Sequence, residues 1–170
     1  KCEKEGDQIL PCLAESWSSS EDGLTWVFKL RQGIQFHDGT AFNASAVEFN
    51  FKRWMDEENL YHNGPFSYWN IVFGGFPGFV KSVKVVSAYS LEIKLSKPYA
   101  PFLNALAMPT FGIASPEAIK KHRLDLSEHP VGTGPFILKS WEPNKSIVLV
   151  RNERYWNGTA KVDEVEFRVI

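Results

Sequence analysis

The clearest alternation of apolar and polar positions lies in residues 24–30, LTWVFKL. Trp26, Phe28 and Leu30 fall on one side of an extended segment, and Lys29 falls on the other side. A period of two residues predicts a β-strand that turns one face towards a core.

The pattern changes to a helical period after the Asp38-Gly39 turn signal. Apolar residues recur at i, i+4, i+7 and i+8, and Asn43 stands where an N-cap is needed. The apolar positions are Val47, Phe51, Trp54 and Met55, and the opposite face holds Glu48, Asn50, Lys52 and Arg53. This pattern predicts an amphipathic helix over about residues 44–56.

Residues 57–79 follow neither period and combine glycines, prolines and many aromatic side chains. We expect a long loop with one short helical turn near residues 68–71. Long loops are usually functional or disordered, and so much aromatic surface argues against disorder. The loop is therefore expected to cover or contact something.

The second half of the chain predicts strands mixed with short helices. The expected elements are a hairpin of residues 80–86 and 90–96, a short helix after Pro101, a helix of residues 116–122 capped by Ser115, and strands at 136–141, 146–151 and 162–170. Together these elements predict an α/β fold with mixed sheets and antiparallel hairpins.

Composition limits the partners. The chain has 170 residues, with 19 basic and 20 acidic residues and a formal net charge of -1, so no positive charge excess favours nucleic acid. No apolar stretch has the length of a membrane helix, and the first ten residues do not follow a signal-peptide pattern. We expect a small or uncharged partner.

The sequence contains no recognisable catalytic or metal-binding motif. The four histidines do not have metal-ligand spacing; they are His37, His62, His122 and His129. No GxSxG elbow marks a nucleophile, and no pair of carboxylates stands in an apolar context. The sequence therefore predicts a protein that is not an enzyme, with no metal and no cofactor.

The two cysteines, Cys2 and Cys12, flank a segment that Gly6-Asp7 can turn back on itself. A disulfide between them would favour an oxidising compartment. Two free or buried thiols fit the sequence equally well, because the Cα separation cannot be read from it.

A tight glycine-containing loop, PVGTGP, occupies residues 130–135. It lacks the lysine and hydroxyl of a P-loop and the spacing of a dinucleotide-binding loop. We interpret Gly132, Thr133 and Gly134 as a structural corner in which glycines permit tight geometry and the prolines stiffen both ends. A ligand contact by the backbone amides of this corner is the alternative.

Three long stretches together resemble one protein family. They are LAESWSSSEDGLTWVFKLRQGIQFHDGTAFNASAVEFNFKR, LSKPYAPFLNALAMP and PVGTGPFILKSWEPNKSIVLVRNERYWNGTAKVDEVEFRVI. They are similar to the extracellular solute-binding proteins of family 5, which serve peptide and nickel ABC importers. The resemblance covers nearly all of the chain.

The resemblance implies part of a two-lobed periplasmic-binding-protein-like fold of type II. Residues 1–130 would form a subdomain appended to the first lobe, residues 131–170 would return to the core sheet of that lobe, and the second lobe would be absent. The implied function is capture of di- or oligopeptides for an ABC permease by a monomeric protein. It would be periplasmic or extracellular, and either lipid-anchored as a lipoprotein or free.

Two other functions stay open. An oligosaccharide or a nickel or other metal chelate would be bound by a member of the same family. An interaction module or a chemoreceptor partner would belong to another class of protein and would use the aromatic loop as its contact surface.

The resemblance also implies ligand-binding residues. Phe66, Tyr68 and Trp69 in the long loop would face the cleft, with packing within their own subdomain as the alternative. Met108 and Thr110 are the second candidates, although Met108 suits a core equally well. Nickel-binding relatives carry arginine where this chain has Thr110, which weakens the nickel interpretation.

Overall fold

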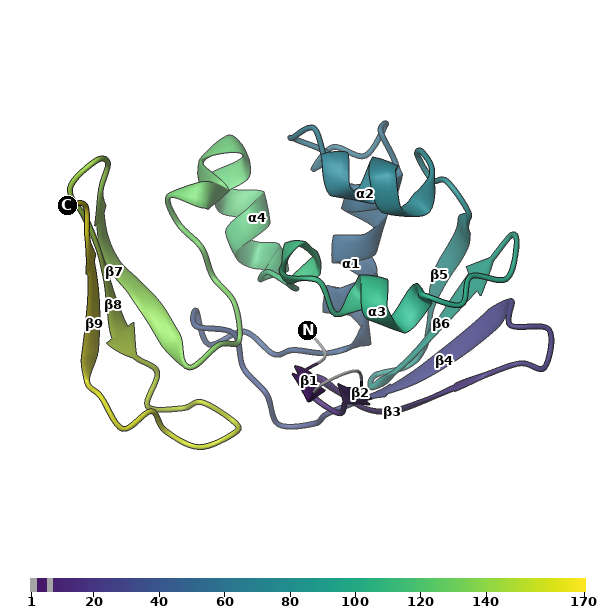
Figure 1. Cartoon of the computed structure of the whole chain (residues 1–170), viewed down its shortest axis with the longest axis horizontal. Coiled ribbons are helices and arrows are strands. Elements are labelled where there is room, and N and C mark those ends of the chain that lie inside the picture. Colours follow the sequence, from purple (N-terminus) through teal and green to yellow (C-terminus); the bar gives the residue numbers. More distant parts are fainter. Residues whose placement is uncertain (1–2, 6–7) are drawn as a thin grey trace. The chain divides into compact units, whose positions relative to one another are not determined.

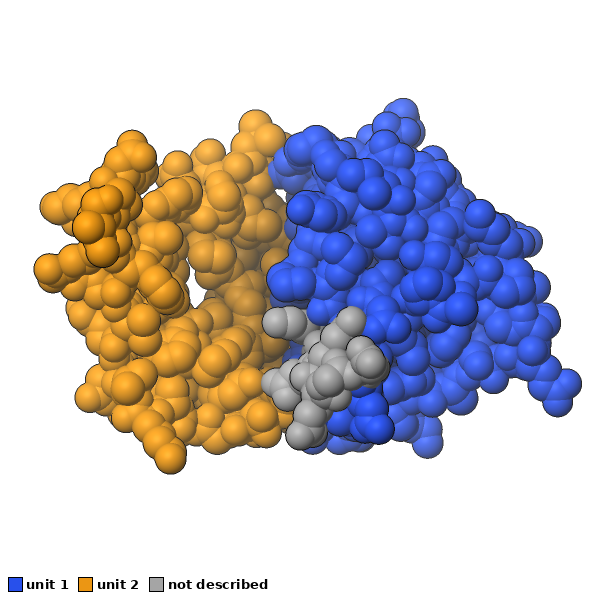
Figure 2. Space-filling model, viewed as in Figure 1, with its two compact units in different colours: residues 1–32, 43–113 blue, residues 33–42, 114–170 orange. Residues whose placement is uncertain are grey.

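The structure is a computed structural model, and it describes residues 3–5 and 8–170. The chain divides into two compact units (Figure 2), one of residues 1–32 and 43–113 and the other of residues 33–42 and 114–170. Within the described residues no helix is long and apolar enough to cross a membrane.

The first unit is built on a four-stranded antiparallel sheet with helices on one side of it (Figure 1). In sheet order the strands are β3 (Ala14–Ser19), β4 (Thr25–Leu30), β6 (Ser90–Leu95) and β5 (Val80–Ser87). The helices are α1 (Ala44–Met55), α2 (Ser67–Phe73), α3 (Phe102–Leu106) and the 3-10 turn η1 (Pro109–Phe111). A short hairpin of β1 (Glu3–Glu5) and β2 (Gln8–Leu10) precedes them.

The strand and helix predictions for this unit are confirmed. On β4, Phe28 and Leu30 are buried, which is the face that the alternation predicted. Helix α1 begins after Asn43, whose side chain accepts a hydrogen bond of 3.0 Å from the Ala46 amide. The hairpin of β5 and β6 is antiparallel, and the short helix after Pro101 is α3. Local periodicity was therefore sufficient for these elements.

Two expectations for this unit need correction. Asn50 was expected on the polar face of the helix, but it is fully buried and its Nδ2 donates a hydrogen bond of 2.9 Å to the Ala46 carbonyl. The loop of residues 57–79 contains α2, which is longer than the single turn expected, because Trp69 and Phe73 anchor it to the core.

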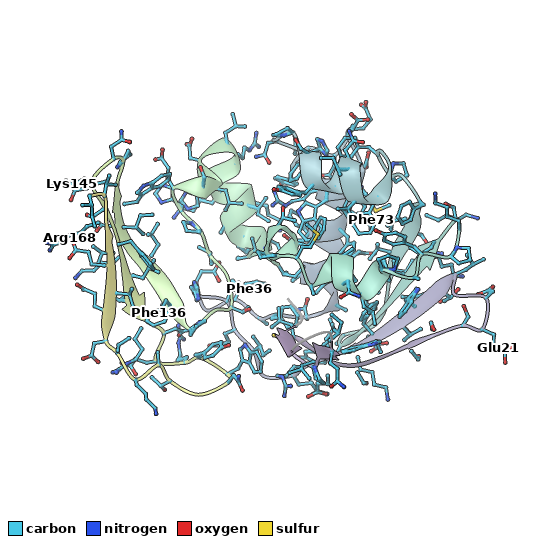
Figure 3. All side chains as sticks on the ribbon, in the orientation of Figure 1. Glu21, Phe36, Phe73, Phe136, Lys145 and Arg168 are labelled. Carbon is cyan, nitrogen blue, oxygen red and sulfur yellow. The ribbon has the colours of Figure 1, made fainter. Side chains whose placement is uncertain are left out.

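The core of the first unit is mainly aromatic. Phe73, labelled in Figure 3, has a fully buried ring that lies 5.4 Å from the Phe111 ring and 6.3 Å from the Phe102 ring, measured between centroids. Trp69 packs 6.2 Å from Trp54 of α1. These contacts join α1, α2, α3 and η1 into one layer above the sheet.

The second unit contains a helix, a 3-10 helix and a three-stranded antiparallel sheet. The elements are α4 (Pro116–His122), η2 (Arg123–Ser127), β7 (Phe136–Glu142), β8 (Ser146–Arg151) and β9 (Glu164–Arg168). The cap at Ser115 is confirmed, because its side chain accepts a hydrogen bond from the Ala118 amide. The Asp38-Gly39 turn is also confirmed, since Gly39 has a φ of 83°.

The fold class is confirmed as mixed α/β with antiparallel sheets. The assignment of residues 1–130 and 131–170 to parts of a larger lobe stays a prediction, because the two units describe contacts within the chain alone.

Candidate functional site

The predicted aromatic site residues lie at the start of α2, and they differ in accessibility. Trp69 is 1% exposed and belongs to the core, whereas Tyr68 is 57% exposed. Ile71, three residues after Tyr68, is 77% exposed. Helix α2 therefore has one face fixed in the core and an apolar face directed to solvent.

Phe66 precedes α2 and has an unusual backbone. Its φ of 37° and ψ of 41° lie in the left-handed region, and its side chain provides no cap for the helix. Its ring lies 5.2 Å from the Arg53 guanidinium carbon and 4.7 Å from the His62 ring. Phe66 is half-buried, so part of this ring remains accessible.

The second pair of candidates lies on a neighbouring element. Met108 is half-buried directly before η1, and Thr110 is an exposed residue within it. Phe111 of η1 packs against Trp69 at 6.1 Å. The two segments chosen from the sequence are therefore neighbours in the first unit, which the sequence pattern alone did not reveal.

The PVGTGP corner lies in the second unit and is held by side chains from distant segments. The His37 ring Nε2 lies 3.0 Å from the Gly134 carbonyl, and the Gly132 amide donates a hydrogen bond of 3.4 Å to His37 Nδ1. The Asn152 Nδ2 group donates to the same Gly134 carbonyl at 3.0 Å. Because Nδ1 accepts a hydrogen bond from the Gly132 amide, Nε2 carries the proton of the neutral imidazole and donates a hydrogen bond to the Gly134 carbonyl.

The backbone at Gly132 and Gly134 does not require glycine, although the sequence suggested that these glycines permit a tight geometry. Neither Gly132 nor Gly134 has a positive φ, and a Cβ built on either one would meet no atom within 4 Å. The corner depends on hydrogen bonds rather than on glycine geometry. Its interpretation as a structural element remains a prediction.

Hydrogen bonds also tie Asp38 into this unit. The Ser115 hydroxyl donates to Asp38 Oδ2 at 2.5 Å, and the Thr40 hydroxyl donates to Oδ1 at 2.6 Å. Burial would raise the pKa of Asp38, but the hydrogen bonds from Ser115 and Thr40 outweigh it, and the pKa is lowered. Burial lowers the pKa of His37, which favours its neutral form.

Three of the four histidines line one pocket of about 610 Å³ in the second unit: His37, His122 and His129. The rings of His122 and His129 lie 4.2 Å apart. The sequence spacing had suggested scattered histidines, and the chain reversal through η2 brings this pair together. No group of three His, Cys, Asp or Glu side chains in the described part of the chain could hold a metal ion.

Cys12 is the one cysteine within the described residues, and its side chain is buried. Cys2 lies outside the described residues, so the disulfide between them stays a prediction.

Sequence comparison gives a family match for most of the chain. Residues 8–170 match the family described as bacterial extracellular solute-binding proteins, family 5 Middle. This chain belongs to that family. The family is one of solute-binding proteins, and the resemblance found in the sequence is thereby confirmed.

Two relatives and one solved structure are representative of the matches. The glutathione-binding protein GsiB of Escherichia coli O1:K1 is 36% identical over 165 residues, which are 93% of this chain and 29% of that protein. Heme-binding protein A of Haemophilus influenzae is 36% identical over 183 residues, covering 98% of this chain and 33% of that protein.

The solved structure is the ABC transporter-associated periplasmic binding protein DppA of Helicobacter pylori in complex with the peptide STSA. It is 34% identical with a TM-score of 0.87, and the match covers 96% of this chain and 34% of that one. This chain therefore spans about a third of the length of these family members.

Proposed function

We propose that this family 5 chain forms part of one lobe of a two-lobed binding protein that captures di- or oligopeptides for an ABC importer. The observation that carries the proposal is the solvent-facing apolar side of α2, with Tyr68 at 57% and Ile71 at 77% exposure. Trp69 and Phe73 fix the opposite side of the helix in the core. A rigidly mounted tyrosine offers a flat apolar face and a hydroxyl, which suits peptides with varied side chains.

The neighbouring η1 segment would widen this surface. Phe66 and Tyr68 on one side, with Met108 and Thr110 on the other, would line the wall contributed by the first unit. The peptide complex of the DppA structure and the glutathione-binding relative support a peptide as the solute. Trp69 would not contact the solute; its buried side chain would hold α2 in place.

The mechanism would be enclosure without a covalent step. The two lobes would close around the solute, and the closed form would be presented to a membrane permease. Residues 1–130 would be the appended subdomain, and residues 131–170 would return to the core sheet of the lobe. We expect a monomeric periplasmic or extracellular protein, with lipid-anchored and free forms both consistent with the chain.

Calorimetry on the full-length protein tests this proposal. Di- and tripeptides are expected to bind, and cello-oligosaccharides and nickel chelates are expected not to bind. Tyr68→Ala should weaken peptide binding by about 5- to 30-fold, as loss of an interfacial aromatic contact of about 1–2 kcal/mol would give. Val86→Ala, at an exposed apolar residue of β5, is the control and should bind as the wild type does. Equal affinity of the Tyr68 variant and the wild type would remove Tyr68 from the site.

A metal chelate is the second candidate, because the heme-binding relative is as similar to this chain as the glutathione-binding one. Binding of hemin or a nickel chelate in place of peptides would favour it. If none of these solutes bound, an interaction module that uses the α2 surface would become the better explanation.

A further inference from the structure

The three-stranded sheet of the second unit has one apolar side. Residues that pair directly across antiparallel strands point to the same side of a sheet, and Ile147 of β8 pairs with Trp141 and with Phe167. A bulge in β7 between Leu138 and Ser140 inserts one residue and so keeps Trp141 on this side. The pairing gives this side seven apolar residues, here called the apolar face: Phe136, Leu138, Trp141, Ile147, Leu149, Val165 and Phe167.

The opposite side of the sheet carries ion pairs. Glu164 and Glu166 pair across to β8 at the positions between those of the apolar face, so they point the other way. Lys139 lies 2.7 Å from Glu164, and Arg168 lies 2.8 Å from Glu166. Antiparallel sheets commonly have one face packed on a core and one face in water. The charged side suits water, so the apolar face is the side that needs a cover.

The residues that the structure describes leave this face uncovered. None of its seven side chains is buried, and Trp141 and Phe167 are 43% and 58% exposed. A cavity of about 500 Å³ lies against the face and is lined by five of the seven residues. In the sheet of the first unit, by contrast, Phe28, Leu91 and Ile93 are buried. Soluble proteins seldom leave a continuous apolar surface of this kind in water, and such surfaces mark interfaces.

The charge of the face indicates which kind of interface this is. Arg151 lies at one end of the face, opposite Phe136, and it forms ion pairs of 2.6 Å with Glu153 and with Asp163. The seven residues themselves carry no charge. Permanent interfaces are more apolar than those that form and dissolve repeatedly, such as a contact with a permease. The charged termini of a peptide would also find no partner on this face.

Chain length indicates where the cover comes from. This chain spans about a third of the length of the family members compared with it. The match to the DppA structure nevertheless covers 96% of this chain with a TM-score of 0.87. A family member therefore has a large amount of further chain that can pack on a sheet of this kind.

We propose that the apolar face is an internal interface of the full-length protein, covered by aliphatic and aromatic side chains of the same molecule from outside residues 1–170. The inference rests on the proposed function, because it concerns the lobe that this chain would form in part. It adds which side of the β7–β8–β9 sheet is interior. The apolar face belongs to the inside of the lobe, and the side with Glu164 and Glu166 stays in water.

Thiol labelling of the full-length protein tests the interface at two adjacent positions. Phe167→Cys places a thiol on the apolar face, and Glu166→Cys places one on the charged side of the same strand. Without peptide, the thiol at position 167 is expected to react with N-ethylmaleimide about a hundredfold more slowly than the thiol at position 166, because only opening of the fold would expose it. In denaturant the two thiols should react at the same rate.

Two controls keep the result interpretable. The wild-type protein gives the background rate from Cys2 and Cys12, which is subtracted. Val165→Cys is a second variant on the apolar face, and it removes much less volume than Phe167→Cys. It should show the same slow labelling even if loss of the larger ring alters the fold, which circular dichroism would report.

Every other outcome overturns the proposal. Labelling of the variants at positions 165 and 167 as fast as that of Glu166→Cys would place the face in water. Protection that fell on dilution of the protein would assign the face to contact with a second copy. Protection that appeared only with a bound peptide would assign it to the binding cleft.

Peptide calorimetry separates this inference from the proposed function. If no peptide bound while the labelling pattern held, peptide capture would fail and the internal interface would stand. If peptides bound while both faces were labelled equally fast, the internal interface would fail and peptide capture would stand.

Discussion

Removal of the His37 side chain is expected to loosen the PVGTGP corner of the second unit. The imidazole bridges two backbone groups of the corner, the Gly134 carbonyl at 3.0 Å and the Gly132 amide at 3.4 Å. The His37 backbone amide also donates to the Gly132 carbonyl at 2.8 Å, and this bond survives substitution. His37→Ala therefore tests the contribution of the ring alone.

The magnitude follows from what each backbone group retains. Gly134 keeps its hydrogen bond from Asn152, so its carbonyl is not left unpaired. The longer bond to the Gly132 amide is the weaker of the two. With about 1 kcal/mol for each lost hydrogen bond, the free energy of unfolding should fall by about 2 kcal/mol. For a chain of this size that corresponds to a fall of roughly 4–8 °C in melting temperature.

The pH dependence is a sharper test, because it depends on the protonation of one ring. Burial lowers the pKa of folded His37, partly offset by the hydrogen bond to Gly134 and the charge of Asp38. The unfolded chain therefore binds a proton more readily than the folded chain. The contribution of His37 is fully present above the unfolded pKa of about 6.5 and is lost as the pH falls through the folded pKa.

His37→Gln provides the comparison, because glutamine is neutral at every pH and its amide can still donate a hydrogen bond. Thermal melting at about pH 7.5 and about pH 5.5 should show a larger loss of stability for the wild type than for this variant. If the variant lost as much stability as the wild type between the two pH values, His37 would not be the titrating group and the reasoning would be refuted.

Two further predictions concern stability. Gly78→Ala should lower the free energy of unfolding by about 3 kcal/mol or more, because Gly78 has a φ of 68° and a Cβ would lie 2.0 Å from the Phe73 carbonyl oxygen. Gly132→Ala is the control, because there is open space where its Cβ would lie. It should change the free energy of unfolding by less than about 1 kcal/mol in chemical denaturation. Equal effects of these two substitutions would contradict this argument. Ser115→Ala should lower the free energy of unfolding by about 2 kcal/mol, because it removes the cap of α4 and one hydrogen bond to Asp38. A change within about 0.5 kcal/mol would show that neither contact matters.

Much of the secondary structure could be predicted from the chain because its cause is local. The alternation around Phe28 and the helical spacing of Val47 and Phe51 each place apolar side chains on one face within a single element. Caps act over three residues, which is why Asn43 and Ser115 mark the starts of their helices correctly. Helix α2 was underestimated because packing of Trp69 and Phe73, rather than periodicity, holds it.

The candidate site could be predicted in part. The aromatic segment at Tyr68 was identified from its composition and from the family resemblance, but composition cannot tell an exposed ring from a buried one. Tyr68 and Trp69 are adjacent in sequence and differ from 57% to 1% in exposure, because successive residues of a helix point in different directions. The helical pattern placed Arg53 on the polar face of α1. Nothing in the sequence indicated that residues of the following loop would pack against this arginine, because that contact is tertiary.

The sequence by itself determined many of the elements, the mixed α/β class and the family, because these depend on local periods and on long stretches of similar residues. Tertiary structure alone decided which distant groups meet: His37 with Gly134, 97 positions apart, and His122 with His129 across η2. It also decided that the guanidinium of Arg53 lies over the Phe66 ring. Such properties depend on chain reversal and burial, which arise from the packing of the whole unit and are encoded at no single position.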